Sequence, residues 1–183
     1  MYKNFFIIFS IFTFLITSVK SEEQAIKALK KGGNIVFIRH AIAPGGGDPP
    51  NFKLNDCLTQ RNLDNKGIKQ SKKMGLFFEK NNISIDQVLS SEWCRCRDTA
   101  KFAFKDYKTF NALNSFFSEK FRKNKERQMI DLIKFINTWE SKKNLILITH
   151  YVVILESLNR TVSSGEIVIT DTNLNLIGSI SDY

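Results

Sequence analysis

Histidine is scarce in this chain, since its 183 residues include only two, His40 and His150. Cysteine is also rare, with Cys57, Cys94 and Cys96. The Cys-x-Cys spacing lacks a neighbouring histidine pair and matches no common zinc module, so we expect no metal site. Internal repeats, linkers and low-complexity tracts are missing as well. A chain of this length without such breaks is expected to form one domain with a core of its own.

Long apolar runs are also missing. The one marked run, residues 5–16, follows Lys3 and is shorter than the ~20 residues that a membrane-spanning helix requires. A basic residue followed by a short apolar run is typical of a secretory signal peptide. No cysteine follows the run, so a lipoprotein anchor is not expected.

Small residues indicate where the signal peptide is expected to be cleaved. Val19 and Ser21 occupy suitable positions for cleavage after Ser21, and cleavage nearer Ser18 is an alternative. We therefore expect residues 1–21 to be a signal peptide and residues 22–183 to be a single exported, periplasmic domain. An uncleaved amino-terminal anchor is the competing interpretation.

Acidic residues are fewer than basic residues, with 18 Asp and Glu against 27 Lys and Arg, and the formal net charge is +9. Removing residues 1–21 deletes Lys3 and Lys20 and no acidic residue, which lowers the charge to +7. Five lysines share one expected helix, a pattern that fits a solvated helix face better than a nucleic-acid surface: Lys66, Lys69, Lys72, Lys73 and Lys80. The excess still favours an anionic substrate or an anionic membrane surface.

Short apolar runs alternate with helical patterns along the chain. The expected strands are 35–38, 88–89, 144–149, 166–170 and 174–180, with a short extended piece near 109–110. The expected helices are 22–31, 64–82, the later part of 92–104, 123–139 and 152–158. Strands that alternate with helices predict an α/β fold, a three-layer α/β/α sandwich with a mostly parallel central sheet.

Both histidines follow buried-strand patterns. The first strand ends on Arg39 and His40, and a Pro- and Gly-rich loop then prevents regular structure. Another strand ends on His150, and Arg95 lies just past a third. One histidine in such a place is usually structural, but ligands bind where parallel strands end, and these four side chains would meet there. Guanidinium groups bind phosphoryl oxygens, and a neutral imidazole can act as a nucleophile.

These motifs resemble the histidine phosphatase superfamily, which has the phosphoglycerate-mutase-like fold. Arg39-His40 matches the family's R-H-G motif, residues 91–100 match S-x-x-x-R-x-x-x-T-A, and His150 matches the later histidine. The resemblance extends from about residue 34 to the carboxyl terminus. It implies a phosphatase without metal or other cofactor, in which His40 becomes phosphohistidine. Arg39, Arg95 and His150 would then hold the transferred group.

The chain departs from the family pattern in several places. Arg95, not Arg97, has the family's spacing to Thr99, so Arg97 is expected at the surface or the substrate rim. Ala41 replaces the usual glycine after the nucleophile, a small change that keeps the turn tight. Tyr151 replaces a common glycine after the second histidine and is expected to narrow the pocket.

The general acid is the open question in this resemblance. Asn114 and Ser115 stand where an acid is often found, and Asp48 or Glu119 could serve instead, although both could be ordinary exposed carboxylates. The family's phosphohistidine phosphatases also lack an obvious acid. The expected partner is therefore a small anionic phosphorylated substrate or a phosphohistidyl protein. The alternatives are a catalytically weak phosphate-binding envelope protein and a structural envelope protein.

Export would permit a disulfide. Cys94 and Cys96 are too close to pair comfortably, so a bridge should join Cys57 to one of them and leave one thiol free. We predict Cys57–Cys94, which would tether the loop over the site to the turn before Arg95.

Overall fold

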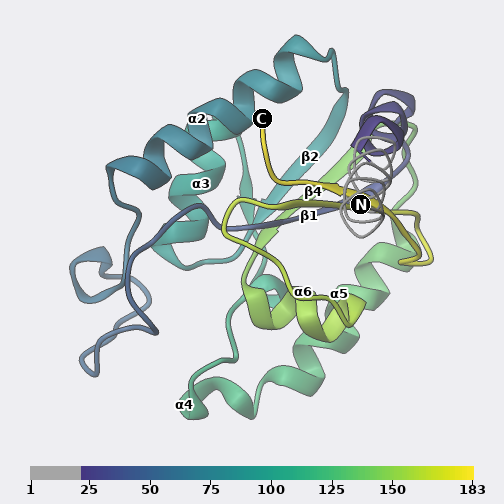
Figure 1. The fold of residues 1–183 in the computed structure, drawn as a ribbon. Coiled ribbons are helices and arrows are strands. Elements are labelled where there is room, and N and C mark those ends of the chain that lie inside the picture. Colours follow the sequence, from purple (N-terminus) through teal and green to yellow (C-terminus); the bar gives the residue numbers. More distant parts are fainter. Residues whose placement is uncertain (1–21) are drawn as a thin grey trace, which may run out of the picture.

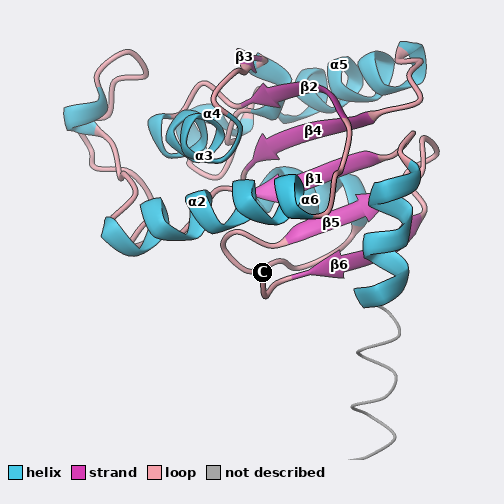
Figure 2. Ribbon diagram, turned by 90° about the horizontal axis from the view of Figure 1, so that it is seen from above, coloured by secondary structure: helices cyan, strands magenta, loops and turns pink. Residues whose placement is uncertain are grey.

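The computed structural model describes residues 22–183, and the expected signal peptide, residues 1–21, lies outside the described part. A six-stranded sheet is covered by helices on both faces, which confirms the α/β sandwich (Figures 1 and 2). Within residues 22–183, the helices are too short or too polar to cross a membrane.

The sheet has the strand order β3-β2-β4-β1-β5-β6. Its strands are β1 (Ile35–Arg39), β2 (Ile85–Ser90), β3 (Lys108–Thr109), β4 (Asn144–Thr149), β5 (Ile167–Thr170) and β6 (Leu176–Ile180). The first four in this order are mutually parallel, while β5 runs antiparallel to both β1 and β6. The sheet is therefore mostly parallel with one antiparallel strand inside it, and β1 and β4 lie at its centre.

The two faces of the sheet carry separate core layers. Val36 and Ile38 of β1 pack toward the helical residues 22–31, α2 (Asn65–Lys80) and α3 (Cys94–Phe104). Ile35 and Phe37 point the other way, toward α5 (Lys125–Thr138) and α6 (Tyr151–Leu158). Because both faces are covered, the middle of each central strand is apolar on both sides, as residues 35–38 of β1 and 145–148 of β4 are.

Helix α2 illustrates how local sequence sets an element. Asp64 caps it by accepting a hydrogen bond from the Gly67 amide at 2.8 Å, as expected for its N-cap position. At Gly75 the helix passes so close to α3 that a Cβ would lie 2.2 Å from the Ala103 carbonyl oxygen. A glycine is therefore needed there for the two helices to pack.

The expected helix at 123–139 is observed as α5, with the short α4 (Glu119–Arg122) before it. Leu132 and Ile136 are buried, whereas Ile133 is 38% exposed. The core-facing row advances by four residues and includes Gln128. Ile133, one residue beyond Leu132, is turned about 100° away from that row.

The bridge between Cys57 and Cys94 is present, which confirms that prediction, and Cys96 is a buried free thiol. Cys57 opens a short 3₁₀ turn in the loop after β1, and Cys94 is the first residue of α3. The bond therefore holds that loop against the start of α3.

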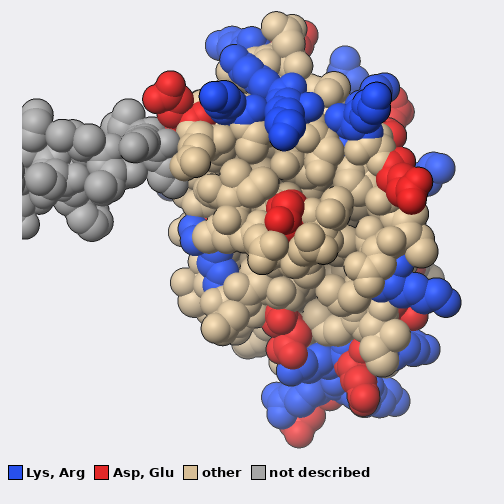
Figure 3. Space-filling view, turned by 90° about the vertical axis from the view of Figure 1, so that its right-hand side faces the viewer, with Lys and Arg blue, Asp and Glu red and all other residues tan. Residues whose placement is uncertain are grey.

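Basic side chains on one face of the molecule form separate groups. Figure 3 shows Lys and Arg gathered near the upper and lower edges of this face, with a broad area of mostly uncharged side chains between them. Such a distribution fits solvated helix surfaces.

Candidate active site

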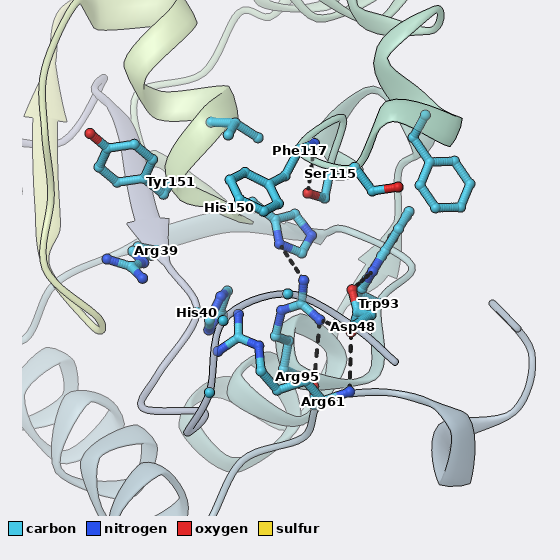
Figure 4. A pocket seen from close by; sticks show the side chains of 16 residues that line it. Arg39, His40, Asp48, Arg61, Trp93, Arg95, Ser115, Phe117, His150 and Tyr151 are labelled. Atoms are coloured by element: carbon cyan, nitrogen blue, oxygen red, sulfur yellow. Dashed lines mark hydrogen bonds and ion pairs between the residues drawn. The ribbon is translucent and has the colours of Figure 1, made fainter. Parts of the chain in front are cut away.

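The two histidines leave the sheet at the same edge because β1 and β4 are parallel neighbours. Arg39 is paired with Thr149, and the His40 amide donates to the Thr149 carbonyl oxygen at 2.9 Å. This register brings the rings of His40 and His150 to a centroid distance of 5.5 Å. Both are almost fully buried at the end of a deep cavity (Figure 4).

The tautomer of His40 follows from its hydrogen bond. Its Nδ1 lies 2.8 Å from the Ala41 carbonyl oxygen, which can only accept, so Nδ1 carries the proton and Nε2 keeps a lone pair. The Ala41 amide in turn donates to the Thr99 hydroxyl at 3.0 Å. Burial, followed by the charge of Arg95, holds the pKa of His40 well below its usual value. His40 is therefore a neutral imidazole with a free nitrogen.

His150 is held by a chain of hydrogen bonds. Ser91 Oγ donates to Asn114 Oδ1 at 3.1 Å and lies 2.8 Å from His150 Nε2. With its proton used in this way, Ser91 accepts from Nε2–H, and the lone pair of His150 Nδ1 faces Arg95 Nη2 at 3.3 Å. Burial, with Arg95 as the next cause, also places the pKa of His150 well below its usual value.

Arginines supply the positive charge of the cavity. Arg95 is only 3% exposed, and Arg39 donates through Nη1 to the Val162 carbonyl oxygen at 2.8 Å. Arg39 and Arg95 line the same cavity as the two histidines, as we predicted from the sequence. Arg97 does not line the cavity, although it lies on the same helix as Arg95.

A third arginine, Arg61, was missed by the sequence analysis. It lies in the loop before α2, where no periodicity singles it out, and it lines the cavity with Nη1 hydrogen-bonded to the Ala43 carbonyl oxygen. Among the described residues, the Nε atoms of Arg39, Arg61 and Arg95 are buried without a hydrogen-bond partner. These unused donors would be satisfied by oxygens of a bound oxyanion.

Asp48 is the only carboxylate among the described residues that line this cavity, and it is already engaged. It accepts hydrogen bonds from Arg95 Nη1 at 2.7 Å, the Arg61 amide at 3.1 Å and Trp93 Nε1 at 3.0 Å. Asp48 therefore anchors Arg95 and closes the loop over the site. Glu119, the other candidate acid, is an exposed residue of α4 that does not line the cavity.

The cavity measures about 430 Å³ and has two unlike sides. Arg61, Arg95 and Asp48 lie on one side in Figure 4, and Phe117, Ser115 and Tyr151 lie on the other, with the histidines between them. Tyr151 is thus one of the residues that line the cavity. Nowhere in residues 22–183 do His, Cys, Asp and Glu side chains gather into a group able to hold a metal ion.

Comparison with known proteins gives similarity in structure alone, because no family model and no curated protein matches the sequence. The alpha-ribazole phosphatase from Shigella flexneri has a TM-score of 0.57 at 16% identity, with 80% of this chain and 93% of that chain covered. A candidate phosphohistidine phosphatase SixA from Agrobacterium tumefaciens has a TM-score of 0.56 at 18% identity, covering 82% and 99%.

A third solved structure is the protein histidine phosphatase SixA complexed with tungstate. It matches with a TM-score of 0.52 at 14% identity and covers 82% of this chain and 94% of that chain. At such identities the likeness concerns the fold, and it extends over nearly the full length of each structure. The chain therefore has the fold of the histidine phosphatase superfamily, the phosphoglycerate-mutase-like α/β sandwich.

Proposed function

We propose that this protein is a phosphatase that needs no metal ion and works through a phosphohistidine intermediate on His40. One observation carries the proposal: a neutral histidine with a free Nε2 lies among three arginines in one cavity, next to a second neutral histidine. The guanidinium groups supply the positive charge that a metal ion supplies in other phosphatases.

In the first step, His40 Nε2 attacks phosphorus. An N–P bond forms, the P–O or P–N bond to the leaving group breaks, and its electron pair departs with the leaving atom. The ring keeps the proton on Nδ1 and becomes positively charged, which the Ala41 carbonyl oxygen stabilises at 2.8 Å. Arg39, Arg61 and Arg95 bind the phosphoryl oxygens during the transfer.

In the second step, water attacks the phosphoryl group. The N–P bond breaks, its electron pair returns to Nε2, and both protons of the water leave on dihydrogen phosphate. His150 lies beside His40, and its Nδ1 lone pair orients the Arg95 guanidinium that binds the phosphoryl oxygens.

Turnover of an aryl phosphate in the presence of EDTA tests the proposal. His40→Ala should abolish it and leave the fold intact by circular dichroism. Acid quenching during turnover should trap an acid-labile, base-stable phosphoryl group on the peptide containing His40. Label on serine or cysteine, or activity that survives His40→Ala, would refute the mechanism.

Arg95 and Arg97 provide a matched pair on one helix. Arg95→Ala should raise the Kd for inorganic phosphate and lower kcat, because it removes a buried cation that also orients Asp48 and His150. Arg97→Ala should change both quantities much less. Equal effects of the two substitutions would contradict the proposed role of Arg95 in binding phosphate.

The alternative function is a phosphate-binding protein with weak catalysis, which the engagement of Asp48 favours because no free acid lines the cavity. An aryl phosphate separates the two proposals, since its leaving group departs without a proton donor. Binding of phosphate with no turnover of this substrate would support the alternative.

Export is a further part of the proposal, supported by the basic residue and short apolar run of residues 1–21. Mass measurement of the protein from an envelope fraction should show these residues missing. An intact amino terminus, or protein found in the cytosol alone, would contradict it.

A further inference from the structure

An aromatic surface also lines the cavity, with Trp93 beside Asp48 and Tyr151 beneath Arg39 (Figure 4). It consists of Trp93, Phe117, Phe121 and Tyr151, and we call it the aromatic wall. Phosphoryl transfer as described above uses none of these four rings. Figure 4 shows Phe117 and Tyr151 beside His150, across the cavity from Arg61.

Three rings of the aromatic wall already have partners. Trp93 and Phe121 pack edge-to-face with centroids 5.3 Å apart, and both contact Phe52. Tyr151 lies beneath the Arg39 guanidinium, 5.6 Å from its ring centre. Trp93 and Phe121 are thus held by one aromatic cluster, and Tyr151 is held separately by Arg39.

Phe117 differs from the other three, because it is 64% exposed while it lines the cavity. Its amide donates to the Ser115 hydroxyl at 3.3 Å, which holds the backbone of this segment. When a ligand covers a large exposed apolar side chain at the mouth of a site, the burial of apolar surface stabilises the complex.

The chemistry of the cavity restricts the leaving group in a second, independent way. Asp48 accepts hydrogen bonds on both of its oxygens, so within residues 22–183 no unoccupied carboxylate lines the cavity to protonate a departing alkoxide. Groups that leave without a proton include phenolates, whose charge is delocalised over a ring. Both constraints therefore favour a ring that is joined directly to the phosphoryl group.

We propose that the aromatic wall is the leaving-group subsite and that the substrate carries its phosphoryl group on an aromatic ring, with Phe117 as the residue that selects for it. The inference rests on the proposed function, since it takes the phosphoryl group to lie at His40. The ring would pack against Phe117 while the phosphoryl oxygens meet Arg39, Arg61 and Arg95.

Binding of phosphonates tests this subsite without turnover. Benzylphosphonate carries a ring one atom from phosphorus, as an aryl phosphate does, and methylphosphonate lacks the ring. Calorimetry on the purified protein should show that benzylphosphonate binds more tightly by roughly 5- to 10-fold, the size of one aromatic contact. Phe117→Ala should remove most of this preference, and Phe117→Tyr should keep it.

Ile130→Ala is the matched control, because Ile130 is 59% exposed on α5 and does not line this cavity. It should change neither affinity. Equal affinities of the wild-type protein for the two phosphonates would overturn the inference. An unchanged preference in Phe117→Ala would also overturn the role of this residue.

Turnover provides the second arm, with acetyl phosphate as an activated substrate without a ring. Phe117→Ala should raise KM for p-nitrophenyl phosphate by roughly 5- to 10-fold and should raise KM for acetyl phosphate much less. Equal losses on both substrates would refute selection by the ring. A benzylphosphonate preference without any turnover would support the subsite while it refutes the proposed catalysis.

Discussion

Ser91 and Ser90 show how neighbouring residues of one type differ in role. Both are fully buried, but only Ser91 contacts a histidine, since Ser90 donates to the Ser91 carbonyl oxygen. Ser91→Ala would remove the hydroxyl acceptor of His150 Nε2–H and leave only the weak acceptor Cys96 Sγ at 3.4 Å. Ser91 is thus a positioning residue for His150.

We expect Ser91→Ala to lower kcat by about tenfold, the effect of one net hydrogen bond of about 1–1.5 kcal/mol. Steady-state kinetics with an aryl phosphate measures this loss. Ser90→Ala, matched in burial and position, should retain kcat. Similar losses in both variants would indicate a general packing defect.

At the residue scale, the sequence predicted four of the six Arg, His and Asp side chains that line the cavity in the described part of the chain. Arg39, His40, Arg95 and His150 could be predicted because each follows a strand or a spaced motif. Arg61 could not, because it lies in a loop without periodicity and reaches the site only through tertiary folding. Asp48 was considered as an acid, and its hydrogen bonds place it instead as an anchor for Arg95.

At the element scale, the bridge from Cys57 to Cys94 connects two segments of the site. Closing a loop of 37 residues stabilises the folded chain by about 3–4 kcal/mol in the chain-entropy model. The same bond holds the loop that carries Asp48 and Arg61 against α3.

Reduction should therefore lower the free energy of unfolding by about 3–4 kcal/mol and raise KM, because the loop is released. Urea unfolding and kinetics with and without dithiothreitol measure these changes. The double variant Cys57→Ala, Cys94→Ala is the control and should be insensitive to dithiothreitol. A reduced protein with unchanged stability and KM would contradict the prediction.

Strands with a continuous apolar run could be predicted from the sequence, but the pairing of strands in the sheet could not. The run Asn144–Thr149 has four consecutive apolar residues, 145–148, at its centre, and its bounds as β4 agree with those predicted from the sequence. Strand β2 begins at Ile85, earlier than expected, because the polar residues Asp86 and Gln87 interrupt its pattern at the exposed end. Antiparallel pairing of β5 with β1 depends on contacts across the sheet that no local pattern contains.

For the whole molecule, the buried histidines make stability depend on pH. The pKa values of His40 and His150 lie well below 6.5 in the folded protein, chiefly because of burial. Below pH 6.5 the unfolded chain therefore binds up to two protons that the folded protein does not bind. Stability should be constant with respect to these groups above that pH and fall as the pH decreases.

Urea unfolding between about pH 7.5 and pH 5 should show this loss, with a slope that approaches about 2.7 kcal/mol per pH unit when both histidines contribute. Other groups also titrate in this range, so His40→Gln serves as the comparison. The variant should lose roughly half of the histidine contribution. Identical slopes for variant and wild type would contradict the burial of a neutral His40.

The pairing of β1 with β4 also determines when the site can form during folding. Asn34 and Asn144 meet at 2.9 Å at the start of the two strands, although 110 residues separate them in the chain. Contacts across such separations form slowly, because a long loop must close before they contribute. Helices α2 and α3 lie within that intervening loop and can form locally beforehand. Recovery of the His40–His150 geometry on refolding should therefore lag behind recovery of helical circular dichroism, which makes enzymatic activity a late reporter of the folding reaction.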